Sequence, residues 1–203
     1  GLIDYAARIQ KFDLAFTPDY TTNTVGQTQL TLTFKGTTKI TDFNGNATTA
    51  VNPTGTTLSG FTNVPTASVG GVTKFTVDGE GLAIRADGSF YISDEYGASI
   101  YHVSKTGQMQ GVITPVQALI PQFSNSAYTG FTTDSAAIAT GIQTGGRRDN
   151  QGMEAVDITP DGKFLVSMLQ SATRQDTPGN KDFNRAYTRL FLYDITKNAT
   201  PTA

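Results

Sequence analysis

Alternation of apolar and polar residues predicts antiparallel strands along much of the chain. From Gln29 to Lys35, leucine and phenylalanine alternate with threonine, which is the pattern of a half-buried strand. A second alternating segment predicts a strand from Arg8 to Phe16. Residues 37–71 are rich in Thr, Asn, Gly and Pro, so we predict a long loop with little regular structure there. The pattern predicts an all-β chain with long loops.

Two hairpins with a shared sequence form the strongest signal in the chain. Residues 80–93 read EGLAIRADGSFYIS and residues 154–167 read EAVDITPDGKFLVS, so the two glutamates lie 74 positions apart (154 − 80). Asp-Gly between alternating segments predicts a tight turn, because glycine accepts the positive φ that the turn requires. We predict that Asp87-Gly88 and Asp161-Gly162 are equivalent turns of adjacent sheets. The side chains expected to be buried are Leu82, Ile84, Phe90, Ile92, Val156, Ile158, Phe164 and Val166.

Each hairpin is predicted to belong to a four-stranded antiparallel sheet, over residues 72–113 and 150–197. The offset between the last strands is 91 (191 − 100), which places 17 extra residues (91 − 74) in the second copy. A short helix is predicted at 116–120 and a polar loop at 122–146. Repeated four-stranded units predict a β-propeller of four-stranded blades with long loops, or a segment of one. Residues 1–203 are then one region, expected to be part of a longer chain; a β-sandwich with a coincidental repeat is the alternative.

Composition narrows the classes of function. The chain has 203 residues, 16% charged residues, a net charge of −2 and no cysteine. This balance argues against a nucleic-acid binder, and no apolar run approaches the ~18 residues of a membrane span. Disulfides, thiolate metal sites and a cysteine nucleophile are excluded. The sequons at Asn46 and Asn198 predict N-glycans and, with the Thr- and Gly-rich composition, an extracellular protein; no signal peptide is recognised at the N-terminus.

Four carboxylates stand at strand starts and ends in the two predicted sheets. They are Glu80, Asp94, Glu95 and Glu154. Ca²⁺ prefers several oxygen ligands, so a calcium site is one interpretation. The chain has one histidine and no thiolate, which disfavours zinc. The alternatives are that Glu80 and Glu154 accept backbone N–H bonds between neighbouring sheets, or that the carboxylates act directly as acid and base.

Basic side chains offer candidate anion sites. Arg147 and Arg148 lie in a glycine-flanked loop, and the planar guanidinium suits bidentate binding of phosphate or carboxylate. Further basic residues of the insertion could approach the same face: Arg174, Lys181, Arg185 and Arg189. The alternative for Arg147 is a structural salt bridge to Glu154 or Asp94. No G-x-S-x-G motif is present, and His102 on an alternating strand is predicted to be a packing or surface histidine, not a catalytic one.

Several short motifs, taken together, resemble the phytase-like domain family described as "esterase-like activity of phytase". The matching segments are Asp78-Gly79-Glu80-Gly81-Leu82, Ser93-Asp94-Glu95-Tyr96-Gly97, Gly146-Arg147-Arg148, Asn150-Gln151-Gly152-Met153-Glu154 and PVQALIP at 115–121. The resemblance covers about residues 72–197. It implies a propeller-like secreted protein that hydrolyses a phosphate or other ester, aided by a bound cation that polarises the ester and activates water.

The resemblance also implies roles for named residues. Glu154, Arg147 and Arg148 would be catalytic, and the cation would be held by Glu80, Asp94, Glu95 and Glu154. The small anionic substrate would be bound by Arg174, Arg185, Arg189 and Asn150. The main alternative is a non-catalytic extracellular propeller whose loop face binds glycan or protein, and a lactonase-like propeller hydrolase is a third. A cation site with at least three carboxylates would favour the enzyme. A dry, salt-bridged channel would favour the binding module.

Overall fold

The chain is an all-β protein in the computed structural model. The structure describes residues 3–18, 20, 29–58, 61–124, 131, 143–177 and 185–201. Within these ranges it has five small antiparallel sheets and one short 3-10 helix, η1 (Gln117–Leu119). The all-β prediction and the short helical turn are therefore confirmed. No helix among the described residues is long and apolar enough to cross a membrane.

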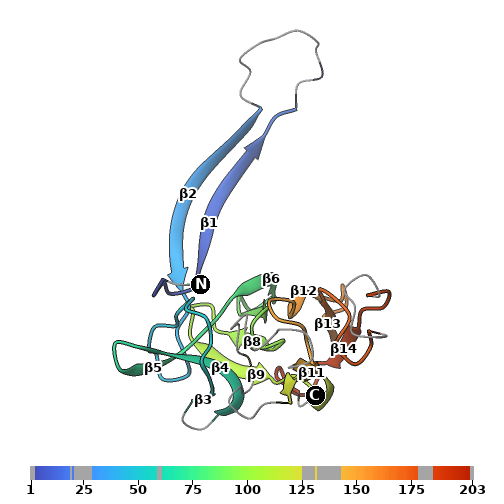
Figure 1. Cartoon of the computed structure of the whole chain (residues 1–203). Helices are drawn as coiled ribbons and strands as arrows, with labels where there is room; N and C mark the ends of the chain where they lie inside the picture. The colour runs from blue at the N-terminus through green and yellow to red at the C-terminus, as the bar shows by residue number, and fades with distance from the viewer. Residues whose placement is uncertain are drawn as a thin grey trace.

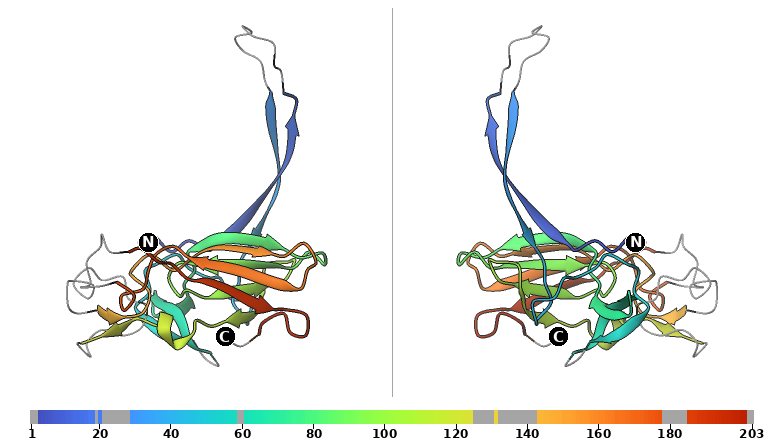
Figure 2. Two further views of the ribbon diagram at one scale, coloured as in Figure 1. Left: turned by 90° about the vertical axis from the view of Figure 1, so that its right-hand side faces the viewer. Right: turned by 90° about the vertical axis from the view of Figure 1, so that its left-hand side faces the viewer.

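A long two-stranded ribbon projects from the body of the molecule (Figures 1 and 2). It consists of β1 (Arg8–Phe16) and β2 (Leu30–Lys39). Their register pairs Phe12 with Phe34, Leu14 with Leu32 and Phe16 with Leu30, which puts all six apolar side chains on one face. Each of the six is 48% to 63% exposed. Both strands were predicted, but the predicted half-burial is wrong, because the ribbon extends beyond the sheets of the body.

Three sheets stand side by side in chain order in the body (Figure 1). The first consists of β3 (Gly55–Leu58), β4 (Phe61–Val69) and β5 (Val72–Phe75). The second consists of β6 (Gly79–Ile84), β7 (Phe90–Asp94), β8 (Ile100–Val103) and β9 (Met109–Ile113). The third consists of β12 (Met153–Ile158), β13 (Phe164–Leu169) and β14 (Leu190–Asp194). A small pair, β10 (Gln122–Phe123) and β11 (Gln143–Gly145), lies between the second and third in the sequence.

Two apolar clusters hold the three sheets together. One face of the β6–β9 sheet packs Phe90, Ile92 and Tyr101 against Ile40, Phe75 and neighbouring side chains. The opposite face packs Tyr91 and Ile100 against Val156, Leu165 and Tyr193 of the β12–β14 sheet. Strands β7 to β9 are therefore covered on both faces of the sheet. The turns at Asp87-Gly88 and Asp161-Gly162 belong to separate, adjacent sheets, as predicted.

The predicted loop at residues 37–71 is wrong in part. Strand β2 runs to Lys39, and strands β3 and β4 lie inside the segment. Threonine is β-branched and favours strands when its segment finds a partner, which outweighed the turn-like composition. Val64, Thr66 and Ala67 are buried in β4 and confirm a core strand.

The hairpin repeat slips by one residue at its second turn. The amide of Arg85 donates to the carbonyl oxygen of Ser89, whereas the amide of Thr159 donates to that of Phe164, one position further on. A shift of one residue turns every following side chain of a strand to the other face. Leu165 is consequently fully buried, while Phe164 and Val166 are only half-buried, contrary to the prediction. The offset between the sheets becomes 75 (164 − 89) after the turn.

Two more expected core positions lie open. Leu82 is 43% exposed and Ile84 is 68% exposed, because the β3–β5 side of the body covers β7 to β9 and not these side chains of β6. Phe90, Ile92 and Val156 are buried as predicted, and Ile158 is half-buried. The second predicted four-stranded sheet has three strands among the described residues, and the sheets do not close into a ring there.

Candidate functional site

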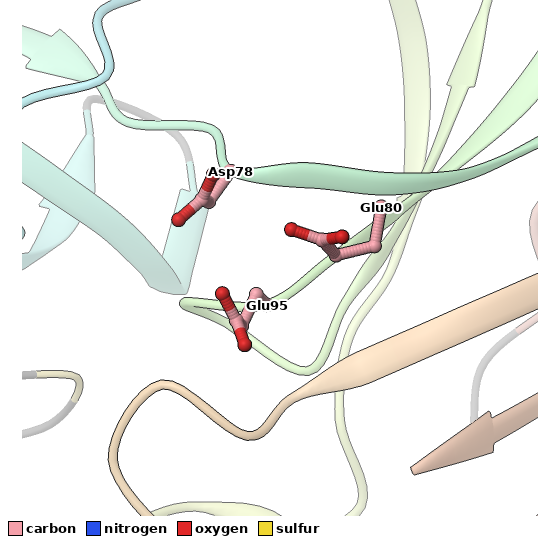
Figure 3. A group of neighbouring side chains, drawn as sticks. All are labelled: Asp78, Glu80 and Glu95. Atoms are coloured by element: carbon pink, nitrogen blue, oxygen red, sulfur yellow. The ribbon is translucent and has the colours of Figure 1, made fainter. Parts of the chain in front are cut away.

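Three carboxylates meet where β6 begins and β7 ends. Asp78, Glu80 and Glu95 each offer an oxygen, and these oxygens all lie within 4.8 Å of one another. Figure 3 shows the three side chains converging from the two chain segments. We call this group, together with the neighbouring Glu154, the carboxylate cluster. An arrangement of several carboxylate oxygens at one point is suited to a hard cation such as Ca²⁺.

Strand pairing brings the first three members together. Gly79 is the register partner of Asp94, and the amide of Glu95 donates to the carbonyl oxygen of Asp78 at 2.9 Å. Asp78 and Glu80 are two residues apart on an extended segment, so their side chains point to the same side. The Asp-Gly-Glu order of the first motif is thus the reason for the convergence.

The fourth member comes from the next sheet. Glu154 lies in β12, which packs beside β6, and its Oε2 is buried without a hydrogen-bond partner. Gly152 makes the close approach possible, since a Cβ there would overlap the carbonyl oxygen of Glu95. Gln170 also contacts the cluster. When its side-chain amide is oriented with the nitrogen towards Glu95, it donates to Glu95 Oε1 (3.2 Å) and to the carbonyl oxygen of Asn150 (3.0 Å).

The electrostatics of the cluster favour neutralisation. Burial, followed by the negative charges of Asp78, Glu80 and Glu154, raises the pKa of Glu95 to about 7. Burial and then the charges of Glu154 and Asp78 also raise the pKa of Glu80. Carboxylates that repel one another in this way are stabilised by a proton or a cation between them.

Asp94, predicted as a metal ligand, holds the turn beside the cluster. Its Oδ1 accepts from the amide of Asp78 (2.9 Å), and its Oδ2 accepts from the amide of Gly97 and from the hydroxyl of Tyr101 (3.2 Å). It is fully buried, and burial raises its pKa to about 7. Both oxygens are engaged in hydrogen bonds of the fold, and Asp78, not Asp94, lies in the group with Glu80 and Glu95.

A pocket of about 250 Å³ adjoins the cluster. Asp78 and Glu80 line it together with Arg8, Leu82 and Ile92. The Arg8 guanidinium lies 3.9 Å from the ring centre of Tyr5, another residue of the wall, and its Nε donates to the carbonyl oxygen of Ala6 (3.3 Å). The site thus combines carboxylates, one arginine and an apolar wall.

Arg147 and Arg148, predicted as catalytic, are buried in the body. Arg147 is 1% exposed and donates to the backbone carbonyl oxygens of Tyr96 (2.7 Å), Arg148 (2.8 Å) and Phe131 (3.4 Å). Burial lowers its pKa to about 10. Arg147 therefore has a structural role, but its partners are backbone carbonyl groups and not the predicted carboxylates of Glu154 or Asp94. Arg148 is 3% exposed.

The three arginines predicted to bind substrate have partners outside the carboxylate cluster. Arg174 Nε donates to Gln143 (3.1 Å), Arg185 Nη1 donates to Gln151 (3.0 Å), and Arg189 forms an ion pair with Asp176 (2.6 Å). Asn150 occupies a turn with a φ of 51°. Lys181 lies outside the described residues.

The remaining sequence predictions concern a histidine and two sequons. His102 is 9% exposed, contacts Ser89 Oγ at 3.2 Å and packs on Tyr91, which confirms a packing histidine. Asn46 and Asn198 are both exposed, and their glycosylation stays a prediction.

Sequence reasoning missed Asp78 and Arg8. Asp78 was visible in the first motif, where its two-residue spacing from Glu80 predicts a shared side of the strand. Arg8 had no comparable signal, because its place in the pocket depends on how the start of β1 meets β6.

Comparison with known proteins gives a family and a distant relative. The family model described as "Phytase-like: Esterase-like activity of phytase" matches residues 4–203. An "Uncharacterized secreted protein" of the fungus Arthroderma benhamiae is 32% identical over 215 residues, which cover 96% of this chain and 42% of that protein. The chain thus spans less than half the length of this relative. No solved structure matches.

Proposed function

The chain belongs to the phytase-like family, and on that premise we propose that it is part of a secreted hydrolase of phosphate or other esters that works with calcium at the carboxylate cluster. The observation that carries the proposal is the convergence of Asp78, Glu80 and Glu95 beside a pocket that also contains Arg8. Secretion is supported by the description of the fungal relative as a secreted protein.

The donor set suits calcium. Asp78, Glu80 and Glu95 would hold the ion through carboxylate oxygens, and no thiolate exists in the chain to favour a softer metal. Glu154 Oε2 is buried without a hydrogen-bond partner, and burial together with the neighbouring carboxylates raises the pKa of Glu95 to about 7; a bound cation would favour the ionised carboxylates. A bound calcium ion would polarise the ester and make a water molecule more acidic.

The chain's own groups would bind the substrate and move the proton. Arg8 would pair with the anionic part of the ester from the pocket wall, because a guanidinium binds phosphate or carboxylate oxygens through two N–H groups. Leu82 and Ile92 would exclude water from that side. Glu154, which lies close enough to Glu80 and Glu95 to raise the pKa of both, would accept the proton of the attacking water.

The repeated sheets support an architecture for this enzyme. We propose that β6–β9 and β12–β14 are consecutive blades of a β-propeller, because equivalent hairpins pack face to face in chain order. Arg147 would then act as a positioning residue that fixes the turn after β7, through its bond to Tyr96.

A hydrolysis assay tests the proposal. A phosphate monoester and a carboxyl ester of p-nitrophenol would be offered with calcium or with a chelator. Glu154→Gln should lower kcat by about 10² or more, since a general base typically contributes that much. Asp13→Asn, which changes an exposed carboxylate on the ribbon, should leave kcat unchanged. Calcium binding without turnover of any ester would instead support the non-catalytic binding module.

A further inference from the structure

The third sheet has one covered and one bare face. Its covered face packs Val156, Leu165 and Tyr193 against the β6–β9 sheet. On the other face, Val166 pairs with Leu192, and Met168 pairs with Leu190. Alternation along the strands puts these four side chains on the same side, which we call the outer face.

The outer face is apolar and open. Met168 is 39%, Leu190 65% and Leu192 59% exposed, and Val166 is half-buried. Acidic residues flank it, since Asp157 is the register partner of Val166 and Asp194 that of Phe164. A contiguous apolar patch of this kind on a folded protein marks an interaction surface.

Two of the four equivalent positions in the preceding sheet are apolar and lie in the cluster that the β12–β14 sheet covers. With Ser89 equivalent to Phe164, Val166 corresponds to Tyr91, and the strand registers make Leu190 correspond to Ile100. Tyr91 and Ile100 are both 0% exposed, because the β12–β14 sheet covers them. At Val166 and Leu190 the outer face therefore repeats, one sheet later, the surface on which a following sheet packs.

We propose that the outer face is the interface for a further antiparallel β-sheet, which continues the stack and belongs to the same, longer polypeptide. Packed sheets bury apolar side chains from both faces about 10 Å apart, and four aligned apolar positions on two paired strands suit such a partner. The match covers only 42% of the fungal relative, so more than half of that protein lies outside it and is long enough to supply further sheets. The proposal is independent of whether the protein hydrolyses esters.

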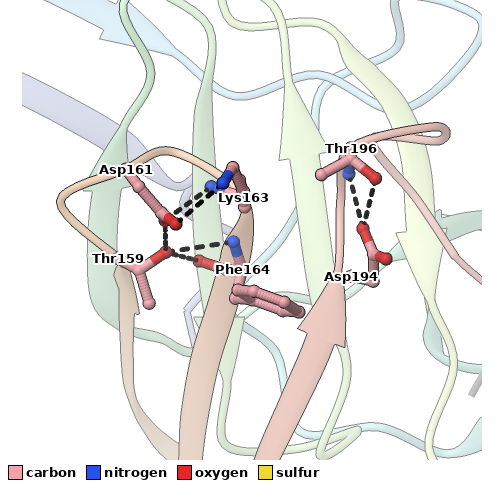
Figure 4. A network of polar contacts seen from close by, with 6 residues as sticks. All are labelled: Thr159, Asp161, Lys163, Phe164, Asp194 and Thr196. Atoms are coloured by element: carbon pink, nitrogen blue, oxygen red, sulfur yellow. Dashed lines mark hydrogen bonds and ion pairs between the residues drawn. The ribbon is translucent and has the colours of Figure 1, made fainter.

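Thiol labelling tests the proposal cleanly, because the 203 residues contain no cysteine. Leu192→Cys and Leu190→Cys would be made, one at a time, in the protein as its gene encodes it. Any cysteine elsewhere in that polypeptide would be replaced by serine. The matched exposed control is Lys163→Cys, in the turn between β12 and β13, where the lysine is 61% exposed and lies 3.6 Å from Asp161 (Figure 4). The probe is an aromatic disulfide reagent, and circular dichroism confirms that each variant folds.

The thiols at positions 190 and 192 should react about tenfold or more slowly than the thiol at position 163, because covered groups react only after local opening. Their rates should not change on dilution of the protein. Rates equal to the control would overturn the proposal, since the face would then be bare. Protection that disappears on dilution, with a halved mass in sedimentation, would also overturn it and would assign the face to a second copy.

Discussion

The Nε of Arg147 donates a hydrogen bond to the carbonyl oxygen of Tyr96 at 2.7 Å, across 51 positions of sequence. This contact ties the Gly-Arg-Arg loop to the turn that carries Glu95. Arg147 therefore stabilises the backbone of the carboxylate cluster without being a member of it.

Replacement of Arg147 should destabilise the fold. Arg147→Lys would leave buried carbonyl groups without donors, and each such group costs about 1–3 kcal/mol. We expect a loss of about 3 kcal/mol in the free energy of unfolding, measured by urea denaturation. Arg189→Lys, at a half-exposed ion pair, is the matched control and should cost less than about 1 kcal/mol. A fully stable Arg147→Lys protein would refute the positioning role.

Gly152 is expected to be essential for the approach of β12 to the cluster. Gly152→Ala would place a methyl group on the carbonyl oxygen of Glu95, so the two segments would have to separate. Unfolding should become easier by about 1–3 kcal/mol, the usual cost of overpacking. Gly36→Ala, where a Cβ meets nothing within 4 Å, serves as the control in the same thermal melt.

In the presence of a chelator, the free energy of unfolding should decrease as the pH rises towards neutrality. Asp94 and Glu95 have a pKa of about 7 in the native protein, above the ordinary values of 3.8 and 4.5. Between about pH 4.5 and 7 the unfolded chain releases protons that the native chain retains, so the free energy of unfolding decreases as pH rises. Each proton of difference contributes a slope of about 1.4 kcal/mol per pH unit.

Urea midpoints from pH 4.5 to 8 measure this slope. It should level off above pH 7, and Glu95→Gln should make it shallower because the amide does not titrate. A midpoint that rises steadily from pH 4.5 to 7 in the wild-type protein would contradict the assigned pKa directions.

The ribbon should contribute little to the stability of the body. Leu14 and Leu32 face each other on its exposed side, so their replacement by threonine removes few contacts. The double variant should change the free energy of unfolding by less than about 0.5 kcal/mol. Leu119→Ala, at a fully buried position, should cost about 2–5 kcal/mol in the same experiment. A large loss in the ribbon variant would show that the body depends on it.

Local sequence patterns predicted the positions of the strands well, but they predicted the burial of the strands' side chains less well. Arg8–Phe16 and the hairpins around Asp87 and Asp161 follow from alternation and Asp-Gly turns. The burial of Leu165 in place of Val166 does not follow from these patterns. The second turn is one residue longer, which leaves the sequence repeat intact but reverses which side chains of β13 face the core. The exposure of the ribbon depends on its projection from the body, which alternation does not encode.

The sequence predicted that the candidate site is made of carboxylates, but it identified only some of the residues that form it. Glu80, Glu95 and Glu154 were selected from motif positions, and the structure brings them together. Asp94 and Asp78 share the same neighbourhood, and hydrogen bonds from two backbone amides decide that Asp94 holds the turn. The burial of Arg147 depends on long-range packing, which the motif does not reveal.

Calorimetric titration of calcium into the chelator-treated protein at pH 7.5 tests the central claim most directly. We expect one site with a Kd at or below about 1 mM, within the range of protein calcium sites. Glu80→Gln should weaken binding about tenfold or more, whereas Asp13→Asn should bind as the wild-type protein does. Heats indistinguishable from dilution in the folded wild-type protein, or equal binding by Glu80→Gln, would contradict a calcium site at the carboxylate cluster.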